Sequence, residues 1–200
     1  MFDLLVDIDV DFFYGPPVYH RGVLNPGQFK AWISPQDFLS RLSAAKIELP
    51  PLAAVGMADH REAYFCWKKA GLRRATVLHF DAHSDCYHSL PEIVHCGNFL
   101  LKAIKQGLVG RVIWVVPSWF YDNPHHPTAE DAFRSVAGGM YRGLPLEMRP
   151  FAELPIFNIT PTMATLSSSP SYVPYSAFAD HFVPLARALG IDYSSVPSAA

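Results

Sequence analysis

The 200-residue chain has few cysteines, no basic run and no long apolar stretch. Its three cysteines, Cys66, Cys86 and Cys96, show no paired spacing, which argues against a disulfide framework and favours a reducing compartment. The formal net charge of −2 and the absence of a basic run argue against nucleic acid as a partner. No apolar run approaches the roughly 20 residues that span a bilayer, so we expect no membrane segment.

The start of the chain enters an apolar, acid-bearing segment at once, which argues against a signal peptide and predicts a cytoplasmic protein. Apolar residues, in contrast, are plentiful: 50% of the chain is hydrophobic, enough to fill a core. We therefore expect a single domain over residues 1–193 and a flexible tail over residues 194–200.

Short apolar runs alternate with helix-like segments. The predicted strands are 3–10, 52–57, 75–80, 111–116 and 158–166. The predicted helices are 36–46, 62–70, 98–106, 128–141 and 176–189. Ser34-Pro35 is a start signal for the first helix, and Gly71, Gly107 and Gly190 are stop signals for three of the others. This alternation predicts a three-layer α/β/α sandwich with a mainly parallel sheet.

The stretch Asp81-Ala82-His83-Ser84-Asp85 directly follows the apolar run 75–80. Alternate residues of an extended backbone face one side, so Asp81, His83 and Asp85 should project together from the end of the strand. Two carboxylates and an imidazole in one small volume are best explained by a divalent cation among them. The alternative is a strand-to-loop turn in which the aspartates only cap the backbone.

Two further polar groups follow apolar runs. Asp7, Asp9 and Asp11 alternate along the first strand, and Asp59-His60 follows residues 52–57. The carboxyl ends of parallel strands line the ligand crevice of α/β sheets, so these groups should meet the first one. The alternatives are an edge strand with a solvated acidic face, and a helix cap at Asp59.

Periodicity leaves two registers open in the first strand, with either Asp7 and Asp9 or Asp9 and Asp11 as the ligand pair. We prefer the second pair because ligands lie near the exit of a strand. His79, which lies deeper in its strand, is interpreted as a core or supporting histidine and not as a ligand.

Together, the DAHSD string, the DIDVD string and the Asp-His pair resemble the three metal-ligand motifs of the arginase and ureohydrolase superfamily. That resemblance implies an arginase/deacetylase-like α/β fold with two manganese ions. The motif order, with Asp9-Val10-Asp11 first, resembles a circularly permuted branch, the peptide arginases, which convert arginine to ornithine within ribosomally made peptides. The resemblance covers roughly residues 3 to 175.

The resemblance implies that each chain holds two Mn²⁺ ions through Asp9, Asp11, His60, Asp81, His83 and Asp85. Asp81 and Asp9 would bridge the ions, His60 and Asp85 would complete one, and His83 and Asp11 the other. An oxygen-rich ligand set suits Mn²⁺. Two ions that share a water lower its pKa, and the resulting hydroxide can attack the inert guanidinium group.

Arginases grip the guanidinium with a carboxylate and move protons with a histidine. Glu62 is our candidate for the carboxylate, and its alternative role is that of a first-turn helix glutamate. The loop His95-Cys96-Gly97-Asn98 resembles the Gly-Asn loop of arginases, although the histidine that should follow is absent. His95 is therefore the candidate proton shuttle, and Asn98 a candidate substrate contact. Ser169-Pro170-Ser171-Tyr172 resembles a Ser-Pro motif of the permuted relatives, with an ordinary turn as its alternative.

We thus expect a metal-dependent hydrolase that releases urea from arginine in a precursor peptide. The chain is shorter than ordinary arginases, and loops over strand ends usually cover the substrate. Trimmed loops predict an open site that suits a peptide. Two alternatives remain: a small-molecule ureohydrolase or related amidohydrolase, and a non-catalytic, metal-stabilised peptide-binding protein, which the missing histidine favours.

Overall fold

The computed structural model describes residues 3–15, 30–86, 93–118, 144–174, 176–194 and 196. Its centre is a six-stranded sheet in which every neighbouring pair of strands runs parallel. In sheet order the strands are β4 (Ala54–Met57), β8 (Met163–Ser167), β1 (Leu4–Asp9), β5 (Ala75–Phe80), β6 (Val109–Val116) and β7 (Leu146–Pro150). A separate antiparallel pair consists of β2 (Tyr14–Gly15) and β3 (Lys30–Ala31).

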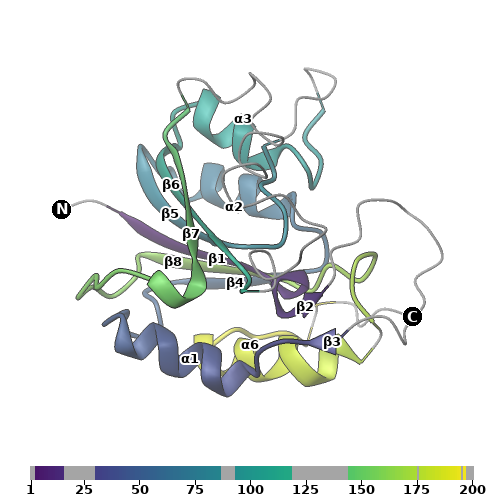
Figure 1. Cartoon of the computed structure of the whole chain (residues 1–200). Helices are drawn as coiled ribbons and strands as arrows, with labels where there is room; N and C mark the ends of the chain where they lie inside the picture. Colours follow the sequence, from purple (N-terminus) through teal and green to yellow (C-terminus); the bar gives the residue numbers. More distant parts are fainter. Residues whose placement is uncertain are drawn as a thin grey trace.

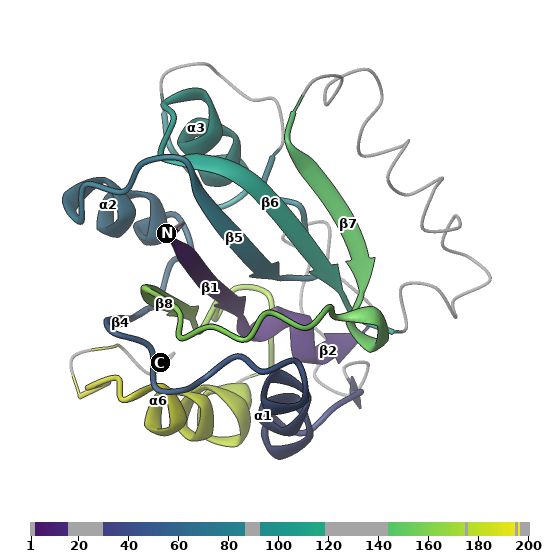
Figure 2. The same ribbon diagram turned by 90° about the vertical axis from the view of Figure 1, so that its left-hand side faces the viewer.

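Helices cover both faces of the sheet (Figures 1 and 2). One face carries α2 (Glu62–Lys69) and α3 (Phe99–Lys105), and the other carries α1 (Pro35–Ala44) and α6 (Val183–Leu189). The shorter elements are the 3-10 turns η1 (Val10–Phe13) and η3 (Phe151–Glu153) and the π-helical segment η4 (Phe178–Phe182). The predicted three-layer α/β/α sandwich is confirmed. Within the described residues, no helix is long and apolar enough to cross a membrane.

Successive residues of the inner strands face opposite helix layers, so the chain has two hydrophobic cores. On β1, Leu4, Val6 and Ile8 pack toward α1 and α6, whereas Leu5 packs toward α2 and α3. The helices contribute Phe38, Leu42, Leu185 and Leu189 to the first core and Ala63, Trp67, Phe99 and Leu100 to the second. Burial on both faces explains why the inner strands are almost continuously apolar in sequence.

The predicted helix signals form as expected. The Ser34 side chain accepts a hydrogen bond from the backbone N–H of Asp37 at 3.1 Å, and Pro35 is the first residue of α1. Gly71, Gly107 and Gly190 have φ between 70° and 72°, which ends the preceding helices in the left-handed conformation.

Other expectations need correction. The strand predicted over 158–166 begins only at Met163, and β7 and the β2–β3 pair were not predicted. The helix predicted over 176–189 is divided into η4 and α6. Val196, which we had placed in a flexible tail, is buried against the core, so that prediction is wrong for this residue. The helix predicted over 128–141 lies outside the described residues.

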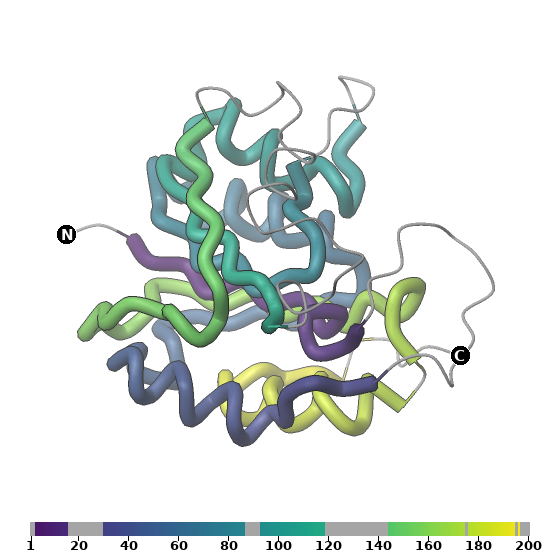
Figure 3. The backbone as a smooth tube through the Cα atoms, viewed as in Figure 1, coloured from purple at the N-terminus to yellow at the C-terminus, as the bar shows by residue number. Residues whose placement is uncertain are grey.

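The topology brings distant parts of the sequence to one edge of the sheet. β1 lies between β8 and β5, and β4 lies beyond β8. Figure 3 shows the purple N-terminal strand running among segments from the middle and end of the chain. Because the strands are parallel, the carboxyl ends of β4, β8, β1 and β5 meet at the same edge, where ligand sites form in such sheets.

Candidate metal centre

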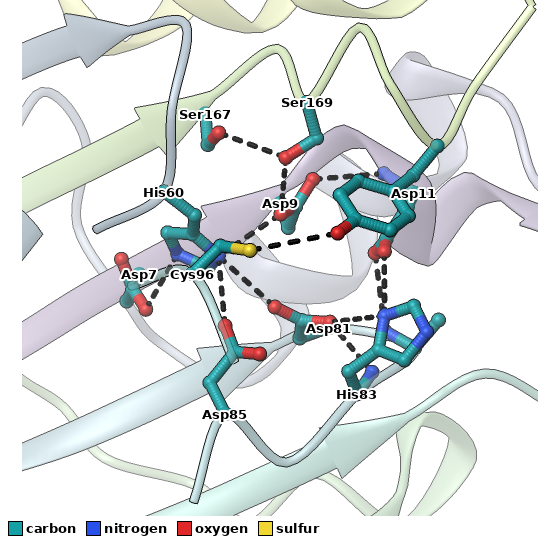
Figure 4. Close-up of polar contacts among 12 residues, drawn as sticks. Asp7, Asp9, Asp11, His60, Asp81, His83, Asp85, Cys96, Ser167 and Ser169 are labelled. Carbon is teal, nitrogen blue, oxygen red and sulfur yellow. Dashed lines mark hydrogen bonds and ion pairs between the residues drawn. The ribbon is translucent and has the colours of Figure 1, made fainter. Parts of the chain in front are cut away.

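The six predicted ligands converge at this edge of the sheet (Figure 4). They are Asp9, Asp11, His60, Asp81, His83 and Asp85. All but His83 are at most 5% exposed, and the side chain of His83 is 13% exposed. Carboxylates buried this close together need compensating charge.

Of these six residues only Asp9 lies in a strand, which corrects the expected strand alternation. β5 ends at Phe80, and Asp85 lies in the following bend with φ of 46°, in the left-handed region. β1 ends at Asp9, where η1 begins, and Asp9 Oδ1 accepts a hydrogen bond from the backbone N–H of Asp11 at 3.1 Å. Asp11 therefore reaches the cluster through a capped 3-10 turn. Strained backbone of this kind is characteristic of functional sites.

Three carboxylate oxygens surround one nitrogen of His60. His60 Nδ1 lies 2.9 Å from Asp9 Oδ2, 3.1 Å from Asp81 Oδ2 and 3.1 Å from Asp85 Oδ2. Within the described part of the chain, however, neither His60 Nδ1 nor Asp81 Oδ2 has a hydrogen-bond partner, although both are buried.

Those distances are compatible with a shared cation. A hydrogen-bond acceptor lies close to the line of the ring N–H, whereas atoms that bind one ion together with the nitrogen lie to its side. Neighbouring donors that each lie 2.0–2.2 Å from an ion are about 3 Å apart. The donor set around His60 Nδ1 therefore fits a divalent metal ion.

A second group adjoins the first and shares Asp81 with it. His83 Nδ1 lies 2.8 Å from Asp11 Oδ2 and 3.5 Å from Asp81 Oδ1. The two oxygens of Asp81 thus face different histidines, as expected of a bridging carboxylate. Asp9 Oδ2 faces His60, and its Oδ1 accepts from the Asp11 N–H, much as Asp81 Oδ1 accepts from the His83 N–H at 2.6 Å. A bridging role for Asp9 stays a prediction.

Asp7 lies one layer behind the cluster. Its Oδ2 is 3.0 Å from His60 Nε2 and 2.8 Å from His79 Nδ1, and its Oδ1 accepts from the Thr165 hydroxyl at 2.5 Å. Asp7, His60 and His79 are also close enough to hold a metal ion, as are His79, Asp81 and Asp85. We favour the Asp9–Asp11 register because Asp9 and Asp11 each group with Asp81, whereas among the described residues Asp7 groups with His60 and His79 at the rear of the cluster.

Several supporting residues escaped the sequence reasoning. The Ser169 hydroxyl donates to Asp9 Oδ2 at 2.5 Å and lies 3.0 Å from the Ser167 hydroxyl. The Phe99 ring packs 4.6 Å from the His60 ring, and the Trp114 indole N–H donates to the backbone carbonyl of Asp81 at 3.0 Å. Only Ser169 lay in a segment with a sequence signal, the Ser-Pro motif.

Cys96 and Tyr172 border the centre on the side of His83. Cys96 projects toward the cluster (Figure 4). Its Sγ lies 3.5 Å from the Tyr172 hydroxyl, and the Tyr172 ring lies 5.9 Å from the His83 ring. Both residues are partly exposed, in contrast to the buried carboxylates.

The predicted substrate contacts are less well placed. Asn98 holds its own loop, because its Oδ1 accepts from the His95 N–H at 2.9 Å and its Nδ2 donates to the Ile93 carbonyl at 3.0 Å. His95 Nδ1 accepts from the Gly97 N–H at 3.1 Å, which assigns the proton of a neutral ring to Nε2. Glu62 is exposed in the first turn of α2, and no described contact joins it to the cluster.

Asp59, the partner of His60 in the Asp-His pair, stays outside the cluster. Its carboxylate accepts from the Arg61 backbone N–H at 3.0 Å and pairs with the Arg61 side chain at 3.1 Å. The carbonyl of Asp59 accepts from the Glu62 N–H at 3.0 Å. The Asp59 side chain therefore holds the turn before α2, whose N-cap residue Arg61 makes no side-chain cap hydrogen bond, and of the Asp-His pair His60 alone enters the centre.

Protons bind tightly to the metal-free cluster. Burial, reinforced by Asp81, raises the pKa of Asp85 to about 7. Burial also raises the pKa of Asp11, with Asp81 and Asp9 adding to the effect. For His60, burial acts in the opposite direction, but Asp7 and Asp9 hold its pKa well above the usual range. A cation that binds here displaces protons from these groups.

The described residues thus include buried Asp/His groups that could hold a metal ion. No family model matches the chain, and neither a curated protein nor a solved structure does. The geometry of the cluster therefore carries the functional assignment.

Proposed function

We propose that the chain is a metal-dependent hydrolase that converts arginine side chains of a peptide to ornithine, with release of urea. The observation that carries the proposal is the environment of His60 Nδ1, which faces three carboxylate oxygens within 3.1 Å and hydrogen-bonds to none within the described residues. The motif resemblance supplies the reaction, and the donor set supports the metal dependence.

The cluster offers donors for two ions that share Asp81. His60, Asp9 and Asp85 would hold one ion together with Asp81 Oδ2, and His83 and Asp11 the other together with Asp81 Oδ1. Four carboxylates balance the charge of two dications. This oxygen-rich set with two imidazoles suits Mn²⁺.

When bound, such a pair of ions supplies a water whose pKa is low enough for attack near neutral pH. The water oxygen forms a bond to the guanidinium carbon, and the bond from that carbon to Nε breaks. The leaving Nε takes up a proton, which yields the ornithine side chain and urea. The protein must therefore place the guanidinium carbon and deliver one proton.

The side chains around the centre support both tasks. The carboxylates attract a cationic side chain, and a planar guanidinium can stack on an aromatic ring such as that of Tyr172. We assign the proton to His95 Nε2, because His95 Nδ1 accepts from Gly97. Glu62, in the first turn of the helix that follows His60, is the proposed partner of the guanidinium.

The peptide substrate is proposed from the resemblance to the permuted branch, whose members act on arginine within peptides. Free arginine carries a charged amine and a charged carboxylate next to its side chain, and an enzyme that selects it must bind both groups, whereas a peptide gains binding energy from its backbone.

The test is urea release by the Mn²⁺-loaded protein from a leader-bearing peptide with an internal arginine, compared with free arginine and agmatine. We expect urea from the peptide alone, with its mass falling by that of urea less water. Asp81→Asn is the inactive control, and Asp37→Asn, at the exposed start of α1, is the matched control.

Two other results of the urea assay would indicate a different function. Efficient hydrolysis of free arginine or agmatine with untouched peptides would show a small-molecule ureohydrolase. Bound metal and bound peptide without urea from any substrate would show a non-catalytic peptide-binding protein.

A further inference from the structure

Behind the proposed metal ligands, three neighbouring strands carry a row of polar side chains that the proposed reaction does not use. Asp7 on β1 lies opposite His79 on β5 and Thr165 on β8 in the parallel register. We call these three residues the polar rung. All three are at most 1% exposed, in the middle of an otherwise apolar sheet.

The hydrogen bonds of the polar rung all meet at Asp7. Thr165 donates to Asp7 Oδ1, while His79 Nδ1 and His60 Nε2 lie 2.8 Å and 3.0 Å from Asp7 Oδ2. An ionised carboxylate only accepts hydrogen bonds, so each histidine must present an N–H to it. The Thr165 hydroxyl takes the other oxygen, which leaves Oδ2 to the two rings.

This arrangement determines which nitrogen of His60 can bind a metal. With its Nε2 proton directed at Asp7, a neutral His60 ring keeps its lone pair on Nδ1. That lone pair points among Asp9, Asp81 and Asp85, whose oxygens lie 2.9–3.1 Å away. Carboxylates behind metal-binding histidines set ring orientation and basicity in this way.

We infer that Asp7 is a positioning residue that fixes the tautomer and orientation of His60 and thereby sets the affinity of the centre for its metal. The inference rests on the metal centre of the proposed function but not on its substrate. The function of Asp7 is then exerted through His60.

Asp7→Asn tests this directly. The asparagine keeps the size of the side chain but brings an NH₂ donor in place of one acceptor oxygen. When that NH₂ faces His60 Nε2, the nitrogen must accept, and the ring proton moves to Nδ1, where the ion binds. We expect the Mn²⁺ affinity, measured by chelator competition, to fall by about 10- to 100-fold.

Thr165→Val is the matched control. It removes a hydrogen bond from the same carboxylate but leaves Oδ2 to accept from both histidines. We expect its Mn²⁺ affinity to stay close to that of the unmodified protein. An equal loss in both variants would overturn the inference, because general loosening of the polar rung would then explain it.

A second readout needs no variant. In protein with ¹⁵N-labelled histidine, loaded with diamagnetic Zn²⁺, the ring nitrogens report where the His60 proton lies. We expect this proton on Nε2, and a proton on Nδ1 would overturn the inference. In the first experiment, an Asp7→Asn protein with unchanged Mn²⁺ affinity would also overturn it. If the unmodified protein binds Mn²⁺ but releases no urea, the proposed reaction is wrong. The Mn²⁺ affinity and the position of the His60 proton still test whether Asp7 positions His60.

Discussion

At the scale of single residues, Asp81 is the side chain on which the centre depends most. One of its oxygens faces His60 and the other faces His83, and the residue is 1% exposed. Histidines hold its pKa below the usual range against the opposing effect of burial. The lowered pKa favours the ionised form of Asp81, which is the form that binds a cation.

The first prediction concerns the loss of this carboxylate. Asp81→Asn removes one shared donor and the charge that it carries, so the protein should lose metal and activity together. Elemental analysis after Mn²⁺ loading and desalting should find two ions per chain in the unmodified protein and at most one in the variant. Asp37→Asn should behave as the unmodified protein. A fully loaded and active Asp81→Ala or Asp81→Asn protein would exclude the bridging role.

The second prediction concerns pH and the metal-free protein. The pKa of Asp85 is about 7 in the folded chain against 3.8 ordinarily, and the pKa of His60 and of His83 lies well above 6.5. Between the ordinary pKa of each group and its raised pKa in the folded chain, the folded chain keeps a proton that the unfolded chain has released. The free energy of unfolding should therefore fall as pH rises from about 4 through about 7 and beyond.

Urea unfolding of metal-free protein at pH 5.5 and pH 8 measures this fall. Asp85→Asn should make the fall shallower, because an amide does not titrate, while His60 and His83 still contribute to it. Asp7 and Asp81 do not disturb the window, since their lowered pKa values act only below about pH 4. Stability that rises over the same interval would refute the proton-binding account of the cluster.

At the scale of elements, the sequence predicted the inner strands and most helices closely. β5 matches its predicted range, and α2 and α3 differ from theirs by one or two residues. β5 is a short, mostly apolar run, and Gly71 and Gly107 mark the ends of α2 and α3 in the sequence. β7 was missed because it is an edge strand with Glu147 and Arg149 along it, so its pattern is that of a polar loop.

The residues of the candidate site were easier to predict than the backbone turns that bring them together. Motif spacing indicated which aspartates and histidines meet, but the turns that carry Asp11 and Asp85 into place depend on local hydrogen bonds. Thr165 and Ser169 contact aspartates about 160 positions earlier in the chain. Thr165 is an ordinary strand residue without a sequence signal, whereas Ser169 lies in the Ser-Pro motif, which did not indicate its contact with Asp9.

The third prediction concerns the edge strand β4, which leads to His60. A Cβ on Gly56 would lie 2.9 Å from Ile191 Cγ2, 3.2 Å from the Phe182 ring and 3.3 Å from Val196 Cγ2. Gly56→Ala should therefore destabilise the protein by about 1–3 kcal/mol through overpacking, as measured by urea unfolding.

Gly71→Ala serves as the comparison. Its Cβ would meet nothing within 4 Å, so its cost comes only from the left-handed backbone with φ of 70°. If Gly56→Ala left stability unchanged, the packing of the C-terminal segment against β4 would be different from that described.

At the scale of the whole molecule, the metal centre links segments that follow β1, β4 and β5. An ion that binds only the folded chain adds to its stability, by about 2.7 kcal/mol when its free concentration is 100 times the Kd. The fourth prediction is a melting temperature that rises with Mn²⁺ concentration and returns to its starting value on chelation. A melting temperature independent of Mn²⁺ would contradict the assembly of the centre in the native fold.

The polar rung also bears on how the sheet assembles. A slip of two residues between β1 and its neighbours keeps every side chain on its own face, so the hydrophobic pattern alone does not exclude it. After such a slip Asp7 would lie opposite Val77 on β5 or Asp81 just beyond its end, and opposite Met163 or Ser167 on β8. A buried carboxylate that has lost its partners costs about 3–5 kcal/mol. The buried carboxylate of Asp7 therefore disfavours this two-residue slip, and it does so before any metal ion binds.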